Sequence, residues 1–211
     1  GTLVFGPIGP SEKKEKPEKE IKSMREFIDY QVSNSRELIE SRRYEDFIQN
    51  PYLVSALYYS QKTLDEIYKK PTKTTQQEIL FKISEIITPE VLEGYISTLD
   101  NKVNNNESSN KPEINLPLDS IRVGKDFMRN HPDALDLFIH EGSPIYNMSS
   151  GIVVLAEDGW KEESPLSTSS YRGGNTVIVY NPTKKEFYRY AHLDKVLVKS
   201  GDIIDMKEII G

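Results

Sequence analysis

The chain has 211 residues and no cysteine, which excludes disulfide bonds and thiolate metal sites. It also has no excess of basic residues. It contains 27 Lys and Arg and 33 Asp and Glu, which gives a formal net charge of −6. We therefore expect no nucleic-acid partner, since the chain has no excess of positive charge to neutralise phosphates. No apolar run approaches the roughly 20 residues of a transmembrane helix, so no membrane span is expected in this chain.

The first half of the chain has the spacing of amphipathic helices. Apolar residues recur every three or four positions across residues 21–103, which we predict to be a helical domain. Proline at position 51 and the Thr88-Pro89 pair are helix-start signals, with Thr88 as the expected N-cap. Residues 1–20 are predicted to hold a short strand and then a charged linker, because the run of Lys and Glu there cannot bury apolar area.

The second half of the chain changes to the pattern of short strands. Residues 104–117 have the composition of a linker, rich in Asn and Ser. Beyond them, apolar β-branched runs at 151–156 and 175–180 are typical of strands, and a turn at 181–185 predicts that the second run forms a hairpin with 186–191. We therefore expect an α+β protein in which a helical region precedes a small antiparallel β domain at 118–211.

An ordered series of short motifs in this β domain resembles the LytM/lysostaphin-type zinc endopeptidases, also called the duplicated hybrid motif metallopeptidases. Each motif is weak alone, but unrelated β domains have no reason to repeat their order. The similarity spans roughly residues 118–211, a little under half of the chain. The motifs are Gly-Lys-Asp-Phe (124–127), Gly-Ser-Pro-Ile-Tyr (142–146), Ser-Gly-Ile-Val-Val (150–154), Gly-Asn-Thr-Val-Ile-Val (174–179), Tyr-Ala-His-Leu (190–193), Val-Lys-Ser-Gly-Asp-Ile-Ile (198–204) and Ile-Ile-Gly (209–211).

The resemblance implies a metal site with an open position for an activated water. In the family, zinc is held by a histidine and an aspartate four residues apart, and by the second histidine of a later His-x-His. By this match Asp126 is the aspartate ligand and His192 is a catalytic histidine that does not bind the metal. Position 122, where the first histidine is expected, is Arg122. The His-x-His is expected after Gly211, so the β domain is expected to be incomplete at its C-terminus.

A guanidinium cannot bind zinc, because it stays protonated and carries only donors. We expect Arg122 and Asp126 to form an ion pair in place of the metal. His131 and His140 are substitute ligands in one interpretation, and surface loop residues in the interpretation that we favour. Trp160 is either a platform for a sugar or a peptide or, by the interpretation that we favour, an ordinary half-buried aromatic residue.

Three functions remain open from the sequence. The first choice is a cell-wall peptidase-like protein that binds peptidoglycan or a partner hydrolase without cutting, and that carries no metal cofactor. The alternative is an active zinc endopeptidase that cleaves peptidoglycan crosslinks, with its remaining ligands beyond residue 211. The third is an assembly module built on the helices. The resemblance implies a bacterial cell-envelope location, periplasmic or extracellular.

Overall fold

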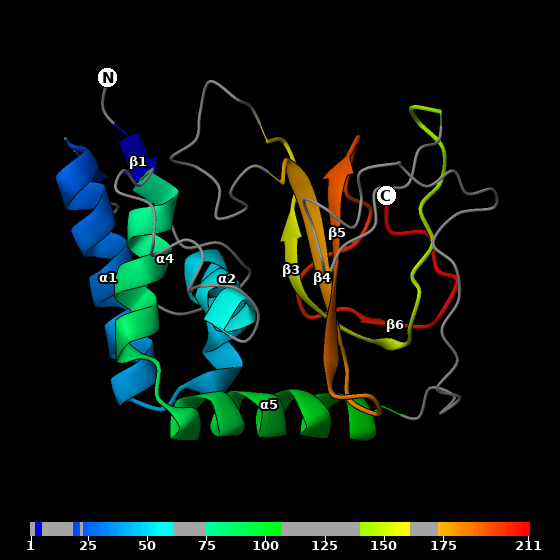
Figure 1. The fold of residues 1–211 in the computed structure, drawn as a ribbon, viewed down its shortest axis with the longest axis horizontal. Helices are drawn as coiled ribbons and strands as arrows, with labels where there is room; N and C mark the ends of the chain where they lie inside the picture. The colour runs from blue at the N-terminus through cyan, green and yellow to red at the C-terminus, as the bar shows by residue number, and fades with distance from the viewer. Residues whose placement is uncertain (1–2, 6–18, 22, 61–74, 107–139, 161–172) are drawn as a thin grey trace, which may run out of the picture.

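The computed structural model describes residues 3–5, 19–21, 23–60, 75–106, 140–160 and 173–211. It confirms an α+β fold, with helices in the N-terminal part and a small antiparallel sheet in the C-terminal part (Figure 1). The described elements, in chain order, are β1 (Leu3–Phe5), β2 (Lys19–Ile21), α1 (Met24–Glu40), the 3-10 helix η1 (Tyr44–Gln49), α2 (Pro51–Ser60), α4 (Thr75–Ile86), α5 (Pro89–Asn104), β3 (Gly151–Glu157), β4 (Asn175–Asn181), β5 (Glu186–Leu193) and β6 (Ile203–Ile204).

Side-chain caps fix where two of the helices begin. The Ser23 hydroxyl accepts a hydrogen bond from the Glu26 N–H at 3.1 Å, at the start of α1. Thr88 caps α5 in the same way, through the Val91 N–H at 3.3 Å, and Pro89 occupies the first turn, which confirms that sequence prediction. Helix α2 begins at Pro51, as the sequence predicted, and is described up to Ser60.

The charged run before the helices differs in part from its prediction as linker. Residues 19–21 form β2, which pairs antiparallel with β1 so that Val4 faces Glu20. Backbone pairing of this kind needs no apolar side chain, because the inter-strand bonds join main-chain groups. The composition of the run therefore did not determine its local structure.

The main sheet has the strand order β5-β4-β3-β6, with every neighbouring pair antiparallel. The predicted hairpin is confirmed, since β4 and β5 pair across the turn from Asn181 opposite Glu186. Two register shifts interrupt the pairing, one in β3 between Val153 and Leu155 and one where β4 begins. Such bulges bend a strand and redirect its side chains.

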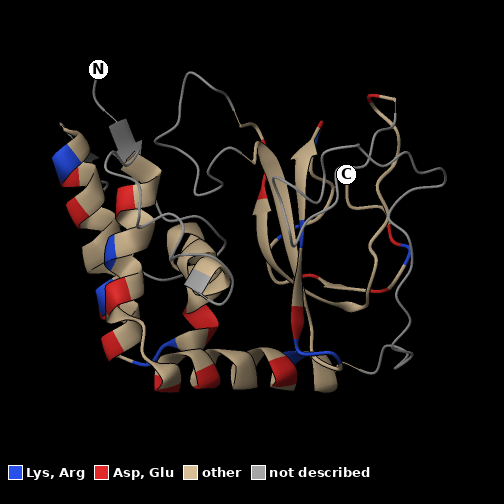
Figure 2. Cartoon of the chain, viewed as in Figure 1, with Lys and Arg blue, Asp and Glu red and all other residues tan. Residues whose placement is uncertain are grey.

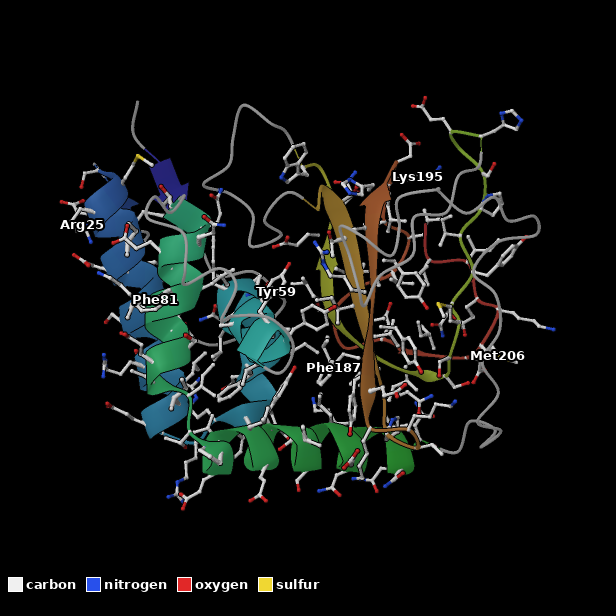
Figure 3. All side chains as sticks on the ribbon, viewed as in Figure 1. Arg25, Tyr59, Phe81, Phe187, Lys195 and Met206 are labelled. Carbon is white, nitrogen blue, oxygen red and sulfur yellow. The ribbon has the colours of Figure 1, made fainter. Side chains whose placement is uncertain are left out.

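Both faces of this sheet are buried. One face shares a core with the helices, and Figure 3 shows Tyr59 of α2 and Phe187 of β5 in the space between them. The other face packs against the segments 145–148 and 196–210, where the Ile145 carbonyl accepts from the Ile210 N–H and the Ile145 N–H donates to the Gly211 carbonyl. The helix-facing side includes Ile152, Val154, Leu155, Ile178, Tyr180 and Phe187, whereas the opposite side includes Val153, Val177, Val179, Tyr190, Leu193, Ile204 and Ile210.

Helix α5 runs below both the other helices and the sheet (Figure 1). Its Asp100 accepts a hydrogen bond from the Tyr180 hydroxyl of β4 at 2.8 Å, and lies 3.5 Å from the Lys185 ammonium. Charged residues gather on the helices, while the strands are mostly uncharged (Figure 2). Among the described residues, no helix combines the length and the apolar character that crossing a membrane requires.

Candidate functional site

The candidate site lies where β5 ends, at His192. Asn175 faces Leu193 and Val177 faces Tyr190, so β5 holds one residue more than β4 between these pairs. His192 lies in this bulge with φ of +58°, in the left-handed region that non-glycine residues seldom adopt. Its N–H donates to the Gly173 carbonyl at 2.7 Å, and its side chain is exposed. Strained backbone and β-bulges both concentrate at functional sites, because they aim a side chain out of the regular ladder.

Trp160 lies beside His192, from the segment that follows β3. The half-buried Trp160 follows Gly159, which has φ of +71°, and its backbone N–H donates to the Asn175 side-chain oxygen at 2.8 Å. Gly174 is close to both residues: a Cβ built there would be 3.8 Å from His192 Cα and 4.0 Å from Trp160 Cε3. We call this arrangement of Trp160, Gly174 and His192 the Trp160–His192 site.

A positively charged side chain, Arg189, lies near this site. The sequence analysis did not identify it. The Arg189 guanidinium lies against Gly173, where a side chain on that residue would begin, so a larger residue there would displace the guanidinium. Its Cζ atom lies 5.9 Å from the centre of the Tyr59 ring, and burial raises the pKa of that tyrosine. Among the described residues, Arg189 Nη2 is buried and has no hydrogen-bond partner. The sequence did contain one indication of where Arg189 lies. Arg189 comes two residues after the buried Phe187, so the two side chains share one face of the sheet.

The structure brings together two of the residues that the sequence singled out, His192 and Trp160. Trp160 is half-buried, as the favoured interpretation expected, and His140 is exposed in the segment before β3. The predicted Arg122–Asp126 pair and His131 lie outside the described residues, so their roles stay predictions.

The described residues do not by themselves fit a zinc site. In that part of the chain, no group of three or more His, Asp or Glu side chains is close enough to hold a metal ion. Zinc sites in proteins use three or four such ligands at fixed geometry. The chemistry available at the Trp160–His192 site is therefore that of an aromatic surface, an exposed imidazole and nearby backbone groups: stacking, hydrogen bonding and proton transfer.

Comparison with known proteins locates the family in this C-terminal region. Residues 130–211 match the sequence model of Peptidase family M23, a span that includes Trp160 and His192 and begins after Asp126. A solved structure from Ruminococcus gnavus, assigned as a glycyl-glycine endopeptidase LytM, aligns at 18% identity with a TM-score of 0.35. That alignment covers 76% of this chain and 64% of the other. No curated protein sequence shows a significant match.

The matched span contains all the sequence motifs except the first, at 124–127. The C-terminal region of this chain, at residues 130–211, is therefore similar to Peptidase family M23.

Proposed function

We propose that this protein acts in the bacterial cell envelope, periplasmic or extracellular, as a LytM-type protein that binds peptidoglycan, or a partner hydrolase, without cutting it. The family match supports the cell-wall role, because the matched residues 130–211 include the exposed His192. The binding surface would be the Trp160–His192 site, where the Trp160 ring and the His192 backbone lie close to a glycine with no side chain. Aromatic rings beside polar groups suit both sugar rings and peptide backbones.

One observation carries the non-cutting part of the proposal: no histidine in this chain is followed by an aspartate four residues later. The positions four residues after His131, His140 and His192 are Leu135, Pro144 and Val196. The family's first two zinc ligands have that spacing, and the aspartate matched to it, Asp126, has Arg122 four residues before it. A guanidinium would repel the ion rather than bind it.

The second candidate is an active zinc endopeptidase. It is favoured by the start of the family match at residue 130, which leaves Arg122 and Asp126 outside and includes His131 and Asp136, five residues apart. Under this candidate His131 and Asp136 supply two of the zinc ligands, and the remaining ligand is the one expected beyond residue 211. His192 then contributes to proton transfer or to hydrogen bonding of developing charge.

Elemental analysis separates the two candidates. The purified protein is equilibrated with zinc, freed of loose metal and assayed for stoichiometry, together with Asp126→Ala, His131→Ala and Asp136→Ala. We expect less than stoichiometric zinc in every sample. Stoichiometric zinc that is lost in H131A and D136A would establish the second candidate, and loss in D126A would restore that residue as a ligand. Either result would overturn the non-cutting proposal.

Sedimentation with purified peptidoglycan tests the binding itself. We expect the protein to pellet with the polymer, and Trp160→Ala or His192→Ala to reduce the bound fraction about tenfold or more, equivalent to roughly 1.4 kcal/mol. Leu197→Ala is the matched control, because Leu197 is 53% exposed and lies outside the Trp160–His192 site. Equal binding by all four proteins would remove this site from the proposal. Absence of wild-type binding would leave the partner hydrolase as the ligand to test by the same variants.

A further inference from the structure

Asn175, the first residue of β4, makes three side-chain hydrogen bonds to two parts of the chain. Its side-chain oxygen accepts from the Trp160 N–H at 2.8 Å. Its side-chain nitrogen donates to the Leu193 carbonyl at 3.0 Å and to the Asp194 carbonyl at 2.9 Å. A single half-buried amide therefore joins the segment after β3 to the end of β5.

These bonds act on the residues that follow His192 directly. The backbone of His192 is in the left-handed region, which costs a non-glycine residue about 1–2 kcal/mol and persists only where the surroundings fix it. The N–H of His192 is held by the Gly173 carbonyl, and the two carbonyls after it are held by Asn175. The strained residue is thus fixed from both sides, once by a glycine carbonyl and once by the amide.

Asparagine is the side chain whose chemistry and length suit this position. The site needs one acceptor for an N–H and a donor group with two hydrogens for two carbonyls, on a single short stem. Aspartate would keep the acceptor but turn a carboxylate oxygen toward the carbonyls of Leu193 and Asp194. Alanine would leave an N–H and two carbonyls without this partner, at a cost of about 1–3 kcal/mol for each one that stays buried.

We propose that Asn175 is a positioning residue that holds Trp160 and His192 in one fixed arrangement next to Gly174. Its effect on ligand binding rests on the function proposed above, whereas its effect on the geometry does not. The backbone at Gly174 lies close to the Trp160 ring and to the His192 backbone, and the Asn175 amide fixes the spacing of these two residues. Preorganisation of this kind raises affinity by removing the cost of ordering the site.

The test is Asn175→Asp, which is nearly isosteric and replaces the two donor hydrogens by a charged acceptor oxygen. The ¹³Cα resonance of His192 reports its backbone conformation, and the fluorescence of Trp160, the single tryptophan of the chain, reports the other side. We expect the His192 resonance to move from left-handed values toward extended ones, the Trp160 emission maximum to shift, and affinity for peptidoglycan to fall about tenfold.

The matched control is Asn181→Asp, at the other end of the same strand. The Asn181 side-chain oxygen accepts from the Thr183 and Lys184 N–H groups, and its nitrogen contacts Ser149. N181D should lower stability without moving either reporter. Unchanged His192 and Trp160 signals in folded N175D would overturn the positioning role. If N175D does not fold, Asn175→Ser, which cannot reach both carbonyls, is measured with the same two outcomes.

A third outcome combines two results: the His192 and Trp160 signals move in N175D, but the wild-type protein does not bind peptidoglycan. They would support the positioning role and count against the proposed ligand. The two proposals can therefore fail separately.

Discussion

The two ends of the β4–β5 hairpin differ in burial and in backbone conformation. At the turn end, near residues 180–187, the side chains are buried against helices: Tyr180 and Phe187 have ring centres 4.8 Å apart, and Tyr180 bonds to Asp100 of α5. At the other end, which we call the His192 end, three neighbouring residues, Gly159, Gly174 and His192, have left-handed backbone, and the histidine is exposed.

Under the proposed function, this difference separates the residues that stabilise the fold from those that bind the ligand along a single hairpin. Apolar burial at the turn end stabilises the fold, at roughly 25 cal/mol for each Å² removed from water. The His192 end carries strain and exposed polar groups, which such burial elsewhere must offset. Substitutions at the turn end should therefore change the free energy of unfolding, whereas substitutions at the His192 end should change binding with little loss of stability.

The largest effect is expected from Phe187→Ala. The Phe187 ring is 6% exposed and contacts Tyr180, with Tyr58 of α2 at 6.3 Å between ring centres. Its removal should cost about 3–5 kcal/mol in the free energy of unfolding, measured by urea denaturation. Because helices and sheet share this core, one cooperative transition should shift as a whole. Two separated transitions would show that the halves fold independently, and Leu197→Ala, at an exposed position, should cost less than about 0.5 kcal/mol.

The next effect is expected from Asp100→Ala, which removes the acceptor of the Tyr180 hydroxyl. Tyr180 is fully buried, so its hydroxyl would lose its partner at a cost of about 1–3 kcal/mol. Asp100→Asn keeps an oxygen acceptor and should recover most of this loss. Lys185→Ala should cost less than about 1 kcal/mol, because the Lys185 side chain is 71% exposed. A larger cost for K185A than for D100A would contradict this account of the turn end.

The stability should also fall at alkaline pH. Burial, and then the hydrogen bond to Asp100 and the charge of that carboxylate, raise the pKa of Tyr180 above its ordinary value of 10. Above pH 10 the unfolded chain loses the phenol proton while the folded protein keeps it. The contribution is therefore complete below pH 10, and it decreases by about 1.4 kcal/mol per pH unit until the folded group also ionises. Urea midpoints from pH 8 to 11 should fall less steeply in Tyr180→Phe, and equal slopes would refute this origin.

The smallest effect on stability is expected at the His192 end, from His192→Gly. Glycine adopts positive φ without the steric cost, so we expect a gain of about 0.5–1 kcal/mol after the greater freedom of the unfolded chain is allowed for. Binding to peptidoglycan should decrease at the same time. Lys207→Gly is the matched control, since Lys207 has φ of +73° outside the Trp160–His192 site and should gain stability without loss of binding. Equal binding of peptidoglycan by H192G and wild type would contradict the proposal that the His192 end is used for binding.

The sequence alone predicted the elements whose cause is local. The Thr88 cap and the hairpin from Asn175 onward depend on residues close together in the chain, and each was found at its expected position. The α+β class followed from the change of apolar period between the two halves.

Tertiary structure decided the site and the shared core. In the sequence, Asn175 looks like an ordinary strand residue. The positioning role proposed for it depends on its hydrogen bonds to Trp160 and Leu193, which lie 15 and 18 positions away in the chain. Likewise Arg189 lies against Tyr59 of α2, and Tyr180 against Asp100, across the whole span between helices and sheet. Periodicity specifies which face of an element is apolar, but the partner of that face is chosen by packing and by the pairing of buried polar groups, which depend on all elements at once.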